Sequence, residues 1–75
     1  MKLLAFGRLS YLAFADVRIP AEVKDSEALR RFVGERWPEL NGPGVQLAVN
    51  QTLVRDAVPL SPGDEIAFLP PMSGG

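Results

Sequence analysis

The chain has 75 residues, a formal net charge of −1, and neither cysteine nor histidine. This composition excludes disulfides, thiol catalysis, Ser–His or Cys–His nucleophiles and the usual transition-metal sites. A chain of this length buries about 60% of its unfolded surface, and we expect residues 1–75 to form a single domain. We do not expect the isolated chain to catalyse a reaction.

Basic side chains are scattered along the chain and form no stripe. The arginines are Arg8, Arg18, Arg30, Arg31, Arg36 and Arg55. Nucleic acids and anionic membranes are bound by clustered positive charge, so we expect neither as a partner. The apolar run over residues 1–6 is too short for a signal peptide or a membrane span, which predicts a cytoplasmic protein.

The N-terminal quarter of the chain predicts two paired strands. Residues 2–6 are short and apolar and are followed by a glycine, as a buried first strand would be. Residues 9–14 fit either a helical turn or an extended loop. Residues 16–19, stopped by Pro20, predict a second strand that pairs antiparallel with the first.

The clearest helix signal follows this segment. Asp25 or Ser26 can accept hydrogen bonds from the first-turn amides. Apolar residues then recur at helical spacing, at Leu29, Phe32, Val33 and Trp37. Pro38 cannot continue a helix. The pattern predicts a helix that ends before Pro38 and packs this stripe, including Phe32, into the core.

The second half of the chain predicts three further strands. Residues 45–49 and 52–54 form a hairpin around Asn50-Gln51, whose first residue tolerates positive φ. A turn cluster then leads into residues 65–69. A right-handed crossover would place the first and last strands side by side at the centre of a mixed sheet, with the helix across one face. This order is α+β and matches the β-grasp arrangement of ubiquitin-like proteins.

The chain ends in a stiff segment followed by two glycines, with the sequence FLPPMSGG over residues 68–75. Each proline holds its φ near −65°, and glycines have no side chain to obstruct a narrow channel. With Gly75 as the native end, residues 70–75 are expected to form an extended tail that presents its carboxylate as the reactive group. A frayed terminus is the alternative, but fraying does not explain the two prolines.

The second half contains three distinctive stretches, LAVNQTLV (47–54), LSPGDE (60–65) and above all FLPPMSGG (68–75). Together they resemble the MoaD family, the sulfur-carrying small subunits of molybdopterin synthase. The resemblance implies that an E1-like (MoeB-like) enzyme uses ATP and Mg²⁺ to adenylate Gly75, which is then converted to a thiocarboxylate. The tail would enter the large (MoaE-like) subunit and give its sulfur to cyclic pyranopterin monophosphate, making the dithiolene of molybdopterin.

The resemblance also implies roles for individual residues. Gly75 would hold the sulfur and Gly74 would line the tunnel with it. The residues implied in partner binding are Phe6, Leu53, Leu69, Pro70, Pro71 and Met72. Strand alternation places Leu4 on the same side as Phe6. The two subunits would form a heterotetramer, and this chain itself would bind no cofactor or metal.

Two other functions fit the same residues. A ThiS-like sulfur carrier for thiazole synthesis, or a ubiquitin-related modifier, shares the fold and the diglycine, although Pro70-Pro71 favours the molybdopterin branch. A plain protein-interaction module would bind through its sheet face and keep an inert tail. Thiocarboxylate formation separates the carriers from such a module.

Overall fold

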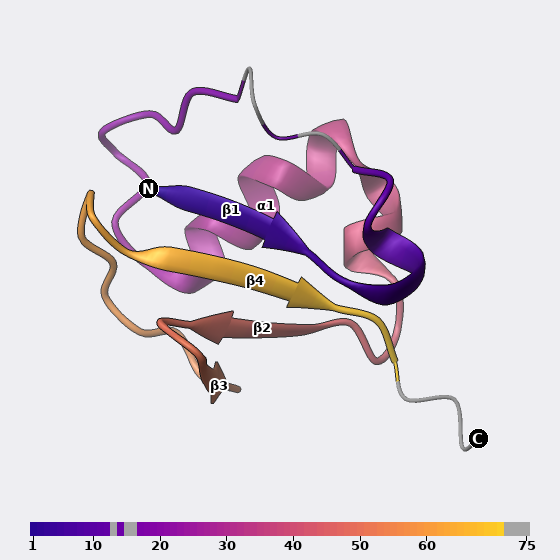
Figure 1. Cartoon of the computed structure of the whole chain (residues 1–75). Helices are drawn as coiled ribbons and strands as arrows, with labels where there is room; N and C mark the ends of the chain where they lie inside the picture. The colour runs from indigo at the N-terminus through magenta and orange to yellow at the C-terminus, as the bar shows by residue number, and fades with distance from the viewer. Residues whose placement is uncertain (13, 15–16, 72–75) are drawn as a thin grey trace.

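The computed structural model of the protein describes residues 1–12, 14 and 17–71. Within these residues, four strands form one mixed sheet, and α-helix α1 (Ser26–Arg36) lies across one of its faces (Figure 1). The sheet order is β1-β4-β2-β3, with β1 at Lys2–Ala5, β2 at Gln46–Val49, β3 at Thr52–Val54 and β4 at Glu65–Leu69. The predicted α+β class and β-grasp arrangement are confirmed.

Strand β4 lies between β1 and β2 and carries the centre of the core. It pairs parallel with β1 and antiparallel with β2, so Phe68 lies between Ala5 on one side and Leu47 on the other. Ile66 and Phe68 are fully buried because they face α1. The last strand of the chain therefore holds the sheet and the helix together.

Helix α1 begins at an acidic cap, as predicted. The Asp25 carboxylate accepts a hydrogen bond from the Ala28 amide at 2.7 Å, which satisfies one of the unpaired first-turn donors. Ser26, the other predicted cap, has a different role. Its hydroxyl oxygen accepts a hydrogen bond from the Val58 amide at 2.9 Å and ties the start of the helix to the loop before β4.

The buried stripe of α1 is narrower than the predicted one. Leu29 and Val33 are fully buried, whereas Phe32 is only half-buried. A helix turns by about 100° per residue, so Phe32 lies beside the line that faces the sheet. Trp37 caps the C-terminus of the helix and Pro38 follows it, which confirms the predicted end.

The second strand predicted from residues 16–19 is wrong for its described part, residues 17–19; residue 16 lies outside the described residues. The Val17 amide donates a hydrogen bond to the Phe14 carbonyl at 3.0 Å. The Phe14 ring packs edge-on against Trp37 and beside Phe68, with centroid distances of 4.9 and 5.8 Å. Phe14 thereby anchors this segment against the core. Among the described strands, β1 therefore lies at an edge of the sheet and not at its predicted centre.

The β2–β3 hairpin turns on two residues with positive φ, Asn50 at 51° and Gln51 at 71°. The prediction for Asn50 is confirmed and extends to Gln51, as a type I′ turn requires. The Asn50 side chain accepts from the Glu65 amide at 3.0 Å and donates to the Asp64 carboxylate at 3.1 Å. Hydrogen bonds from the Ser61 amide and Asn50 hold the pKa of Asp64 below its usual range. The hairpin tip is thus fastened to the start of β4.

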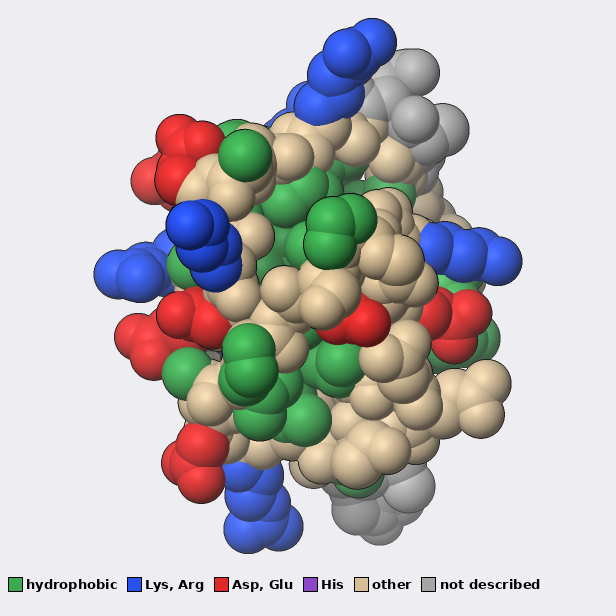
Figure 2. All heavy atoms as spheres, turned by 90° about the vertical axis from the view of Figure 1, so that its left-hand side faces the viewer, with side chains coloured by type: hydrophobic (Ala, Val, Ile, Leu, Met, Phe, Trp, Pro, Cys, Tyr) green, Lys and Arg blue, Asp and Glu red, His purple; other side chains and the backbone are tan. Residues whose placement is uncertain are grey.

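The surface at the start of β1 carries mixed charge. Figure 2 views this end of the molecule and shows acidic and basic side chains interspersed over it.

In the part of the chain that the structure describes, no helix has the length and apolar character needed to cross a membrane. Helix α1 has 11 residues, whereas a spanning helix needs about 20.

Candidate functional site

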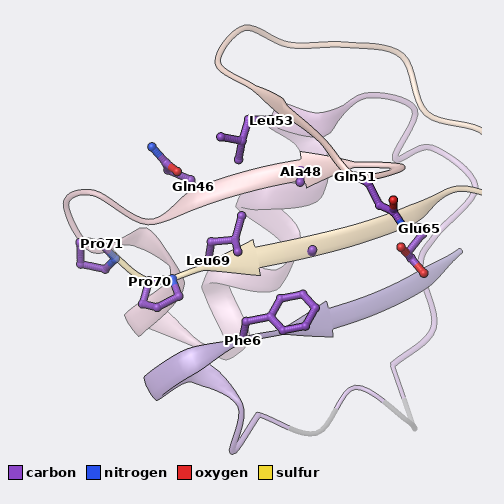
Figure 3. Close-up of a pocket in the computed structure, with 10 residues that line it drawn as sticks. Phe6, Gln46, Ala48, Gln51, Leu53, Glu65, Leu69, Pro70 and Pro71 are labelled. Atoms are coloured by element: carbon purple, nitrogen blue, oxygen red, sulfur yellow. The ribbon is translucent and has the colours of Figure 1, made fainter. Parts of the chain in front are cut away.

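The sheet face opposite α1 carries an apolar groove of about 700 Å³ (Figure 3). Side chains alternate along a strand, so the β4 residues on either side of Phe68 point away from the helix. The strand register then brings Ala67 beside Ala48, and Ala48 beside Leu53. The residues that line the groove are Phe6, Gln46, Ala48, Gln51, Leu53, Glu65, Ala67, Leu69, Pro70 and Pro71.

The groove has a floor of small side chains between larger ones. Ala48 and Ala67 are buried in the middle of the face. Phe6 and Leu53 lie on opposite sides of Leu69 (Figure 3), and they remain 47% and 57% exposed. Large apolar side chains left exposed around one hollow are typical of a surface that binds another protein.

The two ends of the groove differ in character. Gln51 and Glu65 lie at one end, and Pro70 and Pro71 lie at the other (Figure 3). The apolar surface therefore continues to the point where the chain runs on toward its diglycine. Within the described residues, Asp and Glu side chains form no group of three that could hold a metal ion.

The structure brings together every predicted partner-binding residue that it describes. These residues are Phe6, Leu53, Leu69, Pro70 and Pro71. Met72, Gly74 and Gly75 lie outside the described residues, and their roles remain predictions. Leu4 pairs with Ala67 in the register but does not line the groove; it borders a separate hollow beside Leu12 and Phe14.

Half of the groove was not predicted from the sequence. The missed residues are Gln46, Ala48, Gln51, Glu65 and Ala67. Alternation along each strand could have placed Ala48 with Gln46, and Ala67 with Glu65, on common faces. Only the register between β2 and β4 brings these pairs together into one floor, and alternation within single strands does not contain that register.

Tyr11 is a third large exposed side chain, at 66%, but it does not line the groove. Its hydroxyl donates to the Glu39 carboxylate. This hydrogen bond raises the pKa of Tyr11 and lowers the pKa of Glu39. Tyr11 thus provides a comparison for Phe6 and Leu53, because it is exposed to a similar extent at a different place.

Comparisons with known proteins agree with the resemblance seen in the second half of the sequence. Residues 3–75 match the sequence model of the ThiS family. The chain is 40% identical over 80 aligned positions to the molybdopterin synthase sulfur carrier subunit of Escherichia coli (strain K12), covering all of this chain and 99% of that protein. It is 31% identical, with the same coverage, to the protein of that name from Haemophilus influenzae. The chain therefore belongs to the ThiS family, together with the molybdopterin synthase sulfur carrier subunits that it matches along their length.

Proposed function

We propose that this protein is the sulfur carrier subunit of a molybdopterin synthase. Its similarity to two proteins of that name over their whole length supports the proposal. The structural observation that carries it is the apolar groove that ends at Pro70 and Pro71, four positions before Gly75. A partner that covers the groove would receive the chain end at its own active site.

In this proposal the carboxylate of Gly75 carries the sulfur. A carboxylate is a poor electrophile and must first be activated. One of its oxygens attacks the α-phosphorus of ATP, pyrophosphate leaves, and an acyl adenylate forms. A hydrosulfide-equivalent nucleophile then adds to the carbonyl carbon and AMP leaves, which yields the thiocarboxylate.

An E1-like enzyme is the proposed partner for this activation. Among the described residues, no cluster of three carboxylates offers the oxygen ligands that Mg²⁺ prefers. The sequence also contains no phosphate-binding glycine loop with a lysine. We therefore assign ATP and Mg²⁺ to the E1-like enzyme, which would present them to Gly75.

The large subunit of the synthase is the proposed partner for sulfur transfer. The thiocarboxylate sulfur would attack a carbon of cyclic pyranopterin monophosphate and displace an oxygen substituent from it. Water would then attack the Gly75 carbonyl carbon, cleave the acyl–sulfur bond and regenerate the carboxylate. Because a dithiolene holds two sulfurs, two loaded chains would be consumed for each molybdopterin. Four residues follow Pro71, and they span at most about 14 Å. Because Gly74 has no side chain, the end of this segment could enter a narrow channel in the large subunit. Two copies of each subunit would form the heterotetramer.

Charging or shrinking the exposed walls of the groove should weaken binding to the large subunit. Leu53→Asp places an unpaired charge against apolar surface, and Phe6→Ser removes a ring that is 47% exposed. Buried anchors at interfaces are commonly worth about 1–3 kcal/mol, so we expect the Kd to rise about 5- to 150-fold. Isothermal titration calorimetry with the isolated large subunit measures this change.

Tyr11→Ser is the matched control for these two variants, because Tyr11 is exposed but lies outside the groove. Its Kd for the large subunit should stay within about twofold of the unaltered protein. Thermal midpoints should remain close for all three variants. If Leu53→Asp and Phe6→Ser bind as tightly as Tyr11→Ser, the groove is not the docking surface.

The proposed function is tested by loading the chain and then using it. After incubation with an E1-like enzyme, ATP and a sulfur donor, the intact mass should rise by about 16 Da, the difference between sulfur and oxygen. The loaded protein should convert cyclic pyranopterin monophosphate to molybdopterin when the large subunit is added. A ThiS-like carrier would gain the mass without supporting the conversion, and an interaction module would gain no mass.

A further inference from the structure

Two glycines with positive φ lie against the prolines that follow β4. Gly7 has a φ of 60° and Gly44 a φ of 81°. A Cβ atom on Gly7 would lie 2.7 Å from Cγ of Pro70, and one on Gly44 would lie 2.6 Å from Cβ of Pro71. Carbon atoms in contact are normally about 3.5–4.0 Å apart. Each proline ring therefore occupies the space that a side chain at the facing glycine would need.

The two contacts reach the end of β4 from its two neighbouring strands. Gly7 comes just after β1 and begins a short 3-10 helix, and Gly44 comes just before β2. Because β4 lies between β1 and β2, Gly7 and Gly44 approach Pro70 and Pro71 from opposite sides. The chain is held from both sides where it leaves the sheet.

Both glycine loops are themselves fastened to the fold. Before Gly7, the Phe6 amide donates to the Phe68 carbonyl at 3.1 Å, which extends the β1–β4 pairing by one bond. After Gly44, the Val45 carbonyl accepts a hydrogen bond from the Arg30 guanidinium of α1. The positions of the two glycines are thus set by the sheet and by the helix.

Among the five glycines that the structure describes, only Gly7 and Gly44 have a proline atom as the nearest neighbour of an added Cβ. A Cβ on Gly63, which lies in the turn before β4, would have no atom within 4 Å. A Cβ on Gly34, in α1, would meet the side chain of Asn41. Gly7 and Gly44 therefore have a steric reason to be glycine that Gly63 does not share.

We infer that Gly7 and Gly44 are positioning residues that seat Pro70 and Pro71 and so set the direction in which the chain continues toward Gly75. The inference rests on the proposed function. Four residues extended into a partner's site reach about 14 Å, so a tilt of about 10° at Pro71 displaces their far end by about 2 Å. Misplacement of a reacting group by about 1 Å can cost 100-fold in rate.

A double-mutant cycle between Gly7 and Pro70 tests the inference. Gly7→Ala adds both backbone strain, from its positive φ, and a clash with the proline ring. Pro70→Ala removes Cγ and Cδ and leaves Cβ, which lies 4.0 Å from the added methyl group. The strain is the same in both backgrounds, whereas the clash exists only with proline, so the cycle isolates the ring contact.

The readout is the single-turnover rate of sulfur transfer from loaded protein to precursor in the presence of saturating large subunit. Gly7→Ala should lower this rate about 10- to 100-fold while changing the Kd for the large subunit by less than about threefold. In the Pro70→Ala background, the same substitution should change the rate by less than about threefold. An equal loss in both backgrounds would mean that strain alone acts, and this result overturns the inference.

A second cycle covers the case in which Gly7→Ala does not fold. Gly44→Ala is paired with Pro71→Gly, which removes the Cβ atom that lies 2.6 Å from the added methyl group. The same pattern of a large loss with proline and a small loss without it is expected. Gly63→Ala is the control for both cycles and should leave the rate within about twofold.

A measurement that involves no sulfur tests the glycine–proline contacts separately from the proposed function. The unaltered protein should show nuclear Overhauser effects from the Gly7 α protons to the Pro70 ring and from the Gly44 α protons to the Pro71 ring. If these effects are absent, the two glycines do not position the prolines, and the inference is overturned even if sulfur transfer is normal. Failure of the unaltered chain to accept sulfur would overturn the proposed function, whereas the glycine–proline contacts would still be tested by these effects.

Discussion

A chain that lacks Gly75 should accept no sulfur and support no precursor conversion, while its fold stays intact. Composition leaves no substitute, because the sequence has no cysteine that could carry sulfur. The new terminal carboxylate of Gly74 would end about 3.5 Å short of the original position, which is more than a catalytic geometry tolerates. Intact mass after loading and molybdopterin formation measure the two losses.

The fold of the shortened chain is checked by its thermal midpoint. It should stay within about 2 °C of the full-length value, or less than about 0.5 kcal/mol, because the residues of the buried core cluster all lie between Leu9 and Phe68. Gly74→Val keeps the length and should be nearly as damaging, since a β-branched side chain stiffens the backbone and fills a channel sized for glycine. Normal turnover by the shortened protein would contradict the sulfur-carrier proposal.

Phe68→Ala should remove about 3–5 kcal/mol from the free energy of unfolding. Phe68 is fully buried in the central strand and packs against Phe14, whose ring contacts Trp37. A domain of this size has roughly 4–11 kcal/mol in total, so the variant should lose a large fraction of its stability and unfold at a much lower urea concentration. Urea titration followed by the fluorescence of Trp37, the single tryptophan, measures the loss.

Phe32→Ala is the matched control for this prediction, because it deletes the same ring at a half-buried position of α1. We expect it to cost about 1–2 kcal/mol, since part of the ring already contacts water. The sequence pattern alone ranks Phe32 as core. A loss at Phe32 equal to or larger than the loss at Phe68 would show that the core is centred on the helix stripe and not on β4.

Much of the fold could be predicted because its signals are local. The cap at Asp25, the stop at Pro38 and the positive-φ turn at Asn50 each depend on residues within one turn of the chain. The segment before α1 could not be predicted in this way. There, Phe14 packs against Phe68 at the other end of the chain, and this tertiary contact outweighs the local preference of residues 17–19 for a strand.

Some residues of the candidate site could be predicted from the sequence and others could not. The resemblance of the C-terminal sequence to the MoaD family pointed to Phe6, Leu53 and Leu69, and the structure brings these three into one groove. The floor of the groove depends on the β2–β4 register. Pairing of Gly7 with Pro70 depends on where β1 ends relative to β4, which no pattern in either segment specifies.

Strand β4 contributes side chains both to the core and to the groove, and this shared position has a further consequence. Phe68 holds the helix side of the sheet, Leu69 lines the opposite face, and Pro70 follows directly. These three successive residues cannot be separated when the strand detaches. Under the proposed function, a carrier whose core unfolds would therefore lose the groove and the alignment of its chain end in the same event. A partner that binds the groove, as we propose, would thereby select folded molecules before it engages the terminal glycine.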